Sequence, residues 1–132
     1  MKKIEVVAGI IQGNGRFLCT QRGAGGPTAY KWEFPGGKIE KGETPQEALI
    51  REIQEELDVK ITIESHFLTV FHTYSGEDGF ELTMHSFLCQ LCGNRLQFKE
   101  HIGGKWLRAS ELDELDWAEA DWPIVREIMH LE

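Results

Sequence analysis

Glu52, Glu55 and Glu56 are the residues of this sequence whose type and spacing point most directly to chemistry. Residues at i, i+3 and i+4 lie within side-chain reach of one another on a helix. Like charges at that spacing repel, and positions 48 and 49, one turn earlier, are alanine and leucine rather than basic residues. Arg51 lies beside the acids, but no lysine occurs between 45 and 58. We therefore expect the three carboxylates to bind a cation.

The chemistry of this acidic cluster indicates which cation that would be. Carboxylate oxygens suit Mg²⁺ or Mn²⁺, and the cluster contains no His or Cys that would favour Zn²⁺. Such ions hold phosphate oxygens, neutralise charge that develops at phosphorus and acidify a bound water. One of the carboxylates could then act as general base for that water. A solvated acidic helix face is the alternative interpretation of the same residues.

Capping signals define the helix that must position these acids. Thr44 is a good N-cap, Pro45 suits the first helical position, and Glu47 completes a Thr-x-x-Glu capping box. We expect the helix to run to about Leu57, with Asp58 at the C-terminal position that glycine usually takes. Its apolar stripe, which would pack on a sheet, is expected to comprise Leu49, Ile50, Ile53 and Leu57.

Two predicted strands and a glycine turn precede the helix. Segment 3–12 is rich in Val and Ile, and segment 16–22 returns as a second strand after Gly13-Asn14-Gly15. That tripeptide is a hairpin signal, because Gly and Asn accept positive φ. After a glycine-rich loop and a short strand, Pro35-Gly36-Gly37 is expected to turn the chain. Gly37 would bring bare backbone close to a ligand or ion.

Strand patterns dominate the rest of the chain, followed by a second helix. The segment 67–74 continues or follows a strand at 59–64, and a final helix begins near Asp121, a plausible N-cap. This α+β pattern predicts a mixed sheet between helices in a single domain of residues 1–132. The strands predicted around and after the first helix are 31–34, 59–64, 67–74, 80–91 and 105–107.

Composition excludes several classes of partner. A net charge of −8 argues against a nucleic-acid polymer, which requires a basic surface. It does not argue against a nucleotide, because bound cations can invert the local field. The 3 cysteines, an odd number, and the lack of a secretory segment indicate a reduced, cytoplasmic chain. No apolar run reaches membrane-spanning length, so we expect no membrane partner.

The stretch from Gly37 to Val59 also resembles a known pattern, the Nudix box. That pattern is G-x5-E-x7-R-E-U-x-E-E-x-G-U, where U is a bulky aliphatic residue. Gly37, Glu43 and the segment Arg51-Glu52-Ile53-x-Glu55-Glu56-x-x-Val59 match every fixed position except the last glycine, which is Asp58 here. Similarity to the MutT-like branch of the Nudix hydrolases extends along the whole chain. It includes the N-terminal strand, the Gln21-Arg22 ending of the second strand, the segment 32–37 before the box and the late segment 120–123.

The resemblance implies a Nudix α/β/α sandwich with a mixed central sheet. It also implies hydrolysis of a nucleoside diphosphate linked to another group, with Mg²⁺ or Mn²⁺ as cofactor. In such a site Glu100 would be a further metal ligand or base, Arg51 would orient the glutamates, and Glu43 would support the arginine. The metal ligands that the resemblance implies are Gly37 (through its carbonyl), Glu52, Glu55, Glu56 and Glu100.

Four residues are candidates for binding the substrate by the same resemblance. Arg22 and Lys38 would contact phosphate, although Arg22 could equally be an ordinary residue at a strand end. Phe34 would pack against a base, or belong to the core. Asp121 would read the edge of a purine or a cytosine, or cap the last helix. Glu33 and His85 are further candidates for the pocket lining, and both could be ordinary strand residues.

The activity we expect is that of a nucleoside triphosphate pyrophosphohydrolase. It would convert an oxidised or otherwise modified (d)NTP, or CTP, to the monophosphate and pyrophosphate, as a monomer or homodimer. Tyr74, fifteen residues after Val59, keeps a dinucleoside polyphosphate substrate open, whereas the lack of proline in 72–77 argues against ADP-ribose. A non-catalytic nucleotide sensor would normally have lost acids that are all present here.

Overall fold

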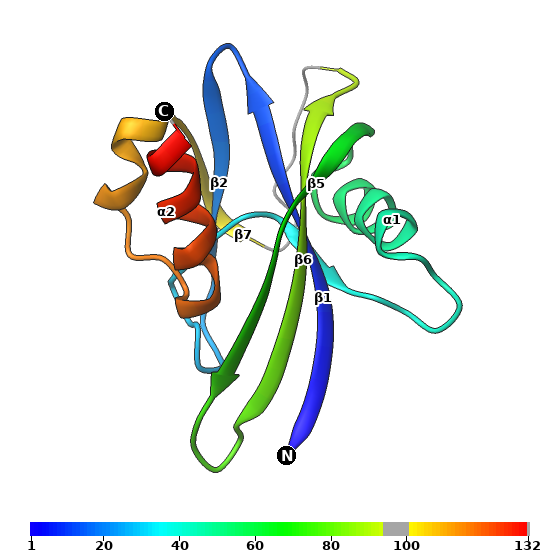
Figure 1. The fold of residues 1–132 in the computed structure, drawn as a ribbon, viewed down its shortest axis with the longest axis vertical. Coiled ribbons are helices and arrows are strands. Elements are labelled where there is room, and N and C mark those ends of the chain that lie inside the picture. The colour runs from blue at the N-terminus through cyan, green and yellow to red at the C-terminus, as the bar shows by residue number, and fades with distance from the viewer. Residues whose placement is uncertain (94–100, 132) are drawn as a thin grey trace.

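Strand β1 (Lys2–Gly13) is the central element of the computed structural model, which describes residues 1–93 and 101–131 (Figure 1). The other elements follow in chain order: β2 (Arg16–Arg22), β3 (Trp32–Glu33), β4 (Gly36–Lys38), α1 (Pro45–Leu57), β5 (Ile61–Tyr74), β6 (Phe80–Leu91), β7 (His101–Leu107), the 3₁₀ helices η1 (Ala109–Glu114) and η2 (Glu119–Asp121), and α2 (Trp122–Leu131). The described strands form one mixed sheet in the order β3-β2-β1-β6-β5, with β4 paired to β1 and β7 to β2. β1 runs parallel to β6 and antiparallel to β2 and β4.

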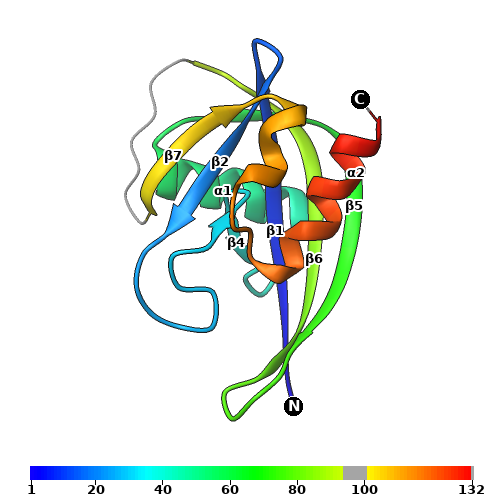
Figure 2. The ribbon, with the colours of Figure 1, turned by 90° about the vertical axis from the view of Figure 1, so that its left-hand side faces the viewer.

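The helices α1 and α2 cover opposite faces of this sheet (Figures 1 and 2). Side chains alternate along β1, so that Ala8 and Ile10 belong to the core under α2, whereas Val7 and Ile11 belong to the core under α1. Alternate residues of a strand point to opposite faces, and a strand covered on both faces is apolar at every position. The fold is therefore α+β, with a mixed sheet between helices, and the predicted sandwich is confirmed.

The predicted signals for α1 are confirmed at both of its ends. The Thr44 hydroxyl accepts from the Glu47 amide at 3.1 Å, and the Thr44 amide donates to the Glu47 carboxylate at 2.9 Å. Asp58 adopts the left-handed conformation, with φ of 55°, and its amide donates to the Gln54 carbonyl. Asp and Asn tolerate this conformation better than most residues, which explains how the helix ends without glycine.

The predicted apolar stripe of α1 is wrong at one position. Ile50 is 44% exposed, whereas Ala48, Leu49, Ile53 and Leu57 are buried together with the carboxylate residue Glu56. At about 100° per residue, position 56 lies only about 20° around the helix from position 49. Ile50 lies about 100° away and reaches the edge of the covered face. One acidic side chain is thus directed towards the sheet.

Gly36 and Gly37 belong to a strand rather than to the predicted turn. β4 pairs with the middle of β1, with Gly36 opposite Ala8 and Gly37 opposite Val7. A Cβ at Gly36 would overlap the carbonyl oxygen of Val7, so the close approach of these two strands requires glycine. Both glycines of β4 line the cavity described below.

β5 is one long strand that contains two irregularities. Its pairing with β6 shifts between Ile63 and Ser65 and again between His66 and Leu68. The segment 67–74 therefore continues the strand at 59–64, one of the two predicted possibilities. β7 begins at His101, before the predicted start at 105, and pairs with β2. Extra residues at bulges turn side chains relative to the regular alternation, which an alternation pattern alone does not reveal.

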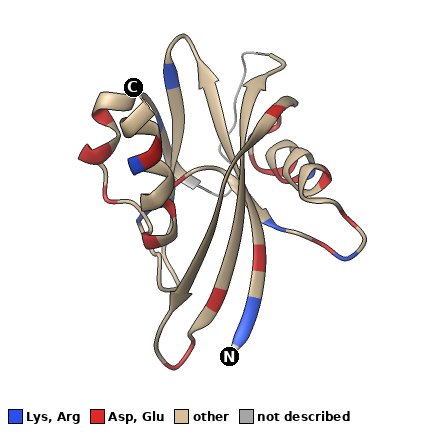
Figure 3. Cartoon of the chain, in the orientation of Figure 1, with Lys and Arg blue, Asp and Glu red and all other residues tan. Residues whose placement is uncertain are grey.

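Acidic residues recur on α1 and on the segments that precede α2, whereas Lys and Arg are scattered over several elements (Figure 3). This distribution accords with the net charge of −8. No helix in residues 1–93 and 101–131 combines the length and the hydrophobicity of a membrane-spanning segment.

Candidate active site

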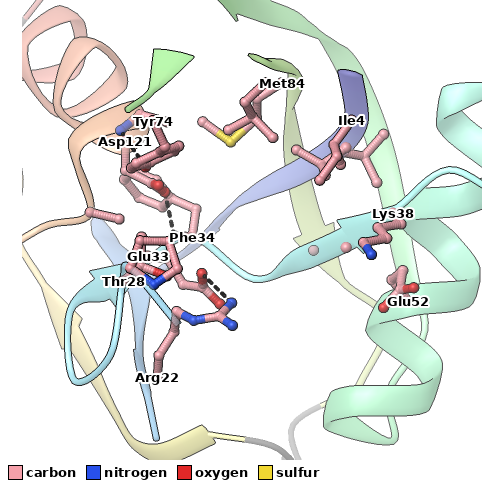
Figure 4. Close-up of a pocket in the computed structure, with 18 of the residues that line it drawn as sticks. Ile4, Arg22, Thr28, Glu33, Phe34, Lys38, Glu52, Tyr74, Met84 and Asp121 are labelled. Carbon is pink, nitrogen blue, oxygen red and sulfur yellow. Dashed lines mark hydrogen bonds and ion pairs between the residues drawn. The ribbon is translucent and has the colours of Figure 1, made fainter. Parts of the chain in front are cut away.

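A cavity of about 720 Å³ lies against β1 and β4 and connects the α1 side of the molecule with the segment that precedes α2. In Figure 4, Lys38 and Glu52 lie on one side of the cavity, and Phe34, Tyr74 and Asp121 lie on the other. Ile4 and Met84 are among the apolar residues between the two sides. The cavity thus joins an acidic, glycine-lined end to an end where the aromatic residues Phe34 and Tyr74 lie beside Asp121.

Arg51 organises the acidic end. Its Nε and Nη2 donate to the two Glu43 carboxylate oxygens at 2.7 and 2.9 Å, a bidentate pair. Its Nη1 donates to Glu52 at 2.9 Å and to Glu55 at 3.2 Å, and Nη2 also reaches the Lys38 carbonyl at 3.0 Å. Arg51, which the sequence places beside the acids, therefore offsets the charge of Glu52 and Glu55 from the same helix.

The pKa values of this ion-pair network follow from these contacts. The hydrogen bond from Arg51 lowers the pKa of the Glu43 carboxyl from 4.5 to about 2. Hydrogen bonds to Glu43, and then to Glu52, raise the pKa of Arg51 above its ordinary value. Both groups are consequently charged at any physiological pH. Glu43 anchors the guanidinium from the loop before α1, and the guanidinium in turn fixes Glu52.

Gly37 and Glu52 fit against each other. A Cβ at Gly37 would overlap the Glu52 carboxylate, so the side chain of Glu52 occupies the space that any other residue at position 37 would fill. The approach of Gly37 to a ligand or ion stays a prediction, and the group that lies against its backbone in the structure is the Glu52 carboxylate. Both residues line the cavity, as does Glu56.

The three glutamates have different surroundings. Glu56 is 5% exposed, the Glu52 side chain is 16% exposed and the Glu55 side chain is 59% exposed. Glu52 and Glu56 line the cavity, whereas Glu55 faces solvent beside Arg51. Glu100, the further acid predicted here, lies outside the described residues. In residues 1–93 and 101–131, no three His, Cys, Asp or Glu side chains converge on one point as a metal centre.

The donor atoms at this end nevertheless suit a divalent ion. Glu52 and Glu56 supply carboxylate oxygens at a wall where glycine leaves the backbone of β4 uncovered. Oxygen donors of this kind favour Mg²⁺ or Mn²⁺ over softer metals. The carboxylates therefore fit the cofactor that their spacing predicted.

Arg22 and Lys38 both line the cavity. Arg22 Nη1 donates to Glu33 at 3.3 Å, and its side chain is 46% exposed. Lys38 lies near Glu52 in Figure 4. The cavity therefore has one basic side chain near each end, and the Arg22 side chain is accessible to a ligand. Glu33 also lines the cavity, whereas His85 bonds to Glu5 at 2.7 Å and is not part of the lining.

Phe34 and Asp121 form the wall opposite the acids. Phe34 is 3% exposed and stacks on Trp117, with 4.7 Å between ring centroids, yet it also lines the cavity. The Phe34 amide donates to Asp121 Oδ2 at 2.9 Å. Asp121 does not cap α2, because its carboxylate is turned towards Phe34 and η2 runs directly into the helix. The capping interpretation of Asp121 was wrong.

Asp121 is a buried acid whose pKa is perturbed. It is 5% exposed. Burial raises the pKa of its carboxyl well above 3.8, and the nearby charge of Glu33 raises it further, against the lowering effect of the Phe34 amide. A carboxyl group kept in a protected pocket at such a pKa can hold a proton and donate a hydrogen bond.

Tyr74 is the pocket residue that sequence reasoning placed least well. It is 8% exposed, its ring lines the cavity, and its hydroxyl accepts from the Ala120 amide at 3.1 Å. The sequence indicates Tyr74 only as a feature of enzymes that act on dinucleoside polyphosphates. Its contact with Ala120 joins β5 to η2, two segments far apart in the sequence, so no local pattern predicts it.

Comparisons with known proteins agree with this fold. The model of the NUDIX domain matches residues 1–128. The chain is 36% identical to an 8-oxo-dGTP diphosphatase of Escherichia coli K12 over 99% of this chain and 100% of that protein. It is 35% identical to the CTP pyrophosphohydrolase of the same strain, over 99% and 95%. A solved MutT structure from methicillin-resistant Staphylococcus aureus shares 39% identity, with a TM-score of 0.80 over 100% of both chains. The chain belongs to the NUDIX family.

Proposed function

We propose that this chain is a nucleoside triphosphate pyrophosphohydrolase that depends on Mg²⁺ or Mn²⁺ and removes modified nucleotides from the nucleotide pool. The observation that supports this function best is the continuous cavity between the α1 carboxylates and the Phe34–Asp121 wall. A base at that wall would place its phosphates towards α1. The products would be the nucleoside monophosphate and pyrophosphate.

In this proposal the metal is held by Glu52, Glu55, Glu56 and the Gly37 carbonyl, with Glu100 as a further ligand or base. A divalent ion held there neutralises charge on the phosphates and lowers the pKa of a bound water. Glu52 contributes from a fixed position, because Arg51 and the bare backbone of Gly37 set its carboxylate. Glu43 supports that arrangement by holding Arg51 with two hydrogen bonds.

Arg22 and Lys38 would bind the phosphate chain. Arg22 is held by Glu33 through one contact of 3.3 Å at a half-exposed position, a weak interaction that a phosphate can replace. A guanidinium matches phosphate oxygens in charge and geometry. Lys38, on the strand that carries Gly37, would offer a second positive charge close to the acids.

Asp121 and Phe34 would bind the base. The Phe34 amide fixes Asp121 Oδ2, which sets the plane of the carboxyl group at the cavity wall. A protonated Asp121 can donate to an acceptor on a base edge, and an ionised one can accept from an amino group. The two states would serve different bases, so the raised pKa of Asp121 bears directly on selectivity.

A comparison of kcat/KM across nucleotides with Mg²⁺ tests the proposed function. The set is 8-oxo-dGTP, dGTP, CTP, 5-methyl-dCTP, a diadenosine polyphosphate and ADP-ribose, with the monophosphate and pyrophosphate identified as products. We expect a triphosphate to be the best substrate and activity to vanish in EDTA. Preference for the diadenosine polyphosphate or ADP-ribose would instead support another substrate of the same family. Binding without turnover of any nucleotide would support a sensor.

A further inference from the structure

The segment 118–121, which carries Asp121, is tied to the sheet from two sides. On the β3 side, the Ala118 amide donates to the Trp32 carbonyl at 2.9 Å, and the Phe34 amide donates to Asp121. These contacts hold the start of the segment and the side chain at its end. Neither contact involves Ala120, the residue that directly precedes Asp121.

On the β5 side, Tyr74 supplies that contact. The Ala120 amide donates to the Tyr74 hydroxyl at 3.1 Å, and Ala120 and Tyr74 are 1% and 8% exposed. One residue further out, His72 Nε2 lies 2.9 Å from Glu119 Oε2, and the His72 ring packs edge-on against Tyr74 at 4.6 Å. Two neighbouring residues of the segment are thus attached to two side chains on the same face of β5. Figure 4 shows Tyr74 next to Asp121.

We infer that Tyr74 is a positioning residue for base selection, whose hydroxyl fixes the Ala120 amide and thereby the depth of Asp121 in the cavity. The inference rests on the proposed function, because it concerns the wall where the base would bind. Without the hydroxyl, a buried amide loses its acceptor, and such a group costs enough free energy to displace its backbone. Asp121 is the next residue and would move with it.

The contact is suited to this role because it does not titrate near neutral pH. Burial raises the pKa of the Tyr74 hydroxyl to about 12, with the nearby Asp121 charge as a smaller cause. The ring itself is held by Phe80, with centroids 5.0 Å apart. Replacing Tyr74 by phenylalanine therefore removes the hydroxyl and leaves a ring that can pack in the same place.

Loss of the Tyr74 hydroxyl should weaken substrate binding and leave the bond-breaking step unchanged. Tyr74 lies on the side of the cavity opposite Glu52, which is fixed by Arg51 and Gly37. In Tyr74→Phe we expect KM for the best triphosphate to rise about tenfold, the loss typical of a buried hydrogen bond, with kcat within about twofold. The ratio of kcat/KM between the best and the poorest base should narrow.

A double-mutant cycle with Asp121→Asn separates positioning from general loosening of the fold. If Tyr74 acts through Asp121, adding Tyr74→Phe to Asp121→Asn should not change the ratio of kcat/KM between the best and the poorest base any further. Tyr30→Phe, a change at the other tyrosine, which is 57% exposed, is the matched control and should behave as the unmodified chain. Equal loss for all bases, or full additivity with Asp121→Asn, would overturn the inference.

Nuclear magnetic resonance gives a readout that does not depend on turnover. Tyr74→Phe should speed hydrogen exchange of the Ala120 amide and shift the Asp121 carboxyl ¹³C resonance. Unchanged signals would contradict the inference, whereas lack of triphosphate hydrolysis by the unmodified chain would contradict only the proposed function. If Tyr74→Phe does not fold, Glu119→Ala tests the same attachment from its exposed end. That change should raise KM about twofold for the best base, as expected for an exposed pair, and an unchanged base preference would count against the inference.

Discussion

Glu52, Glu55 and Glu56 are chemically identical residues that the fold places in different surroundings. Glu56 is directed towards the sheet, Glu52 lies over Gly37, and Glu55 faces solvent. Arg51 contacts Glu52 and Glu55, and Glu56 lines the cavity. Position on the helix therefore assigns each acid a different access to water and to the substrate.

Replacing Glu52 or Glu56 by glutamine should abolish most of the turnover. Each change removes a negative charge that lines the cavity, and we expect kcat to fall at least about a hundredfold, with Mn²⁺ affinity measured by calorimetry also reduced. Glu114→Gln, at an exposed position of η1, is the matched control and should retain activity. Full turnover of either cavity variant would show that the metal assignment is wrong.

The ion pair of Glu43 with Arg51 should make stability depend on acid pH. The pKa of Glu43 is lowered from 4.5 to about 2, so the pair contributes fully above about pH 4.5 and is lost as the pH falls towards 2. Glu43→Gln should therefore lower Tm at pH 7, and the difference in Tm from the unmodified chain should shrink by pH 3. An equal difference in Tm at pH 7 and pH 3 would mean that the Glu43–Arg51 ion pair does not cause the loss of stability.

At the scale of elements, the ends of a helix could be predicted from neighbouring residues, whereas the pairing of distant strands could not. The ends of α1 follow from Thr44, Pro45, Glu47 and Asp58, whose contacts span only a few residues, and these were predicted correctly. The pairing of β4 with β1 joins segments far apart in sequence, and no local pattern distinguishes it from a turn. The buried Glu56 was missed for a related reason, because charge suggested exposure and only packing on the sheet overrides it.

The fit of β4 against α1 gives a prediction at this scale. Gly37→Ala should displace the Glu52 carboxylate, because a Cβ would occupy its position. We expect a loss of kcat of about tenfold or more and weaker Mn²⁺ binding, with the circular dichroism spectrum unchanged. Gly103→Ala in β7 is the control, since a Cβ there would lie 3.9 Å from the Gln21 side-chain oxygen, an ordinary van der Waals distance. Equal activity of both variants would contradict the fit.

At the scale of the whole molecule, the two ends of the cavity differ in how far apart their residues lie in the sequence. The acidic end comes from 37–56, where spacing along one strand and one helix indicates the chemistry. The opposite wall combines Phe34, Tyr74 and Asp121 from three distant segments. Phe34 and Asp121 were predicted through family resemblance. The role of Tyr74 in this wall was not predicted, because its contact with Ala120 depends on the docking of η2 against β5.

The parallel pairing of β1 with β6 has a consequence for the order in which the chain can fold during synthesis. Lys2 pairs with Phe80 and Gln12 with Gln90, so the first strand made lacks its long neighbour until most of the chain has been translated. Until then the β1–β2 hairpin and α1 can form, but the apolar residues of β1 lack one of their flanking strands. Contacts of such sequence separation slow folding and prolong the exposure of apolar surface. A nascent chain that ends before residue 80 therefore leaves the central strand open on that edge, where a ribosome-associated chaperone could bind.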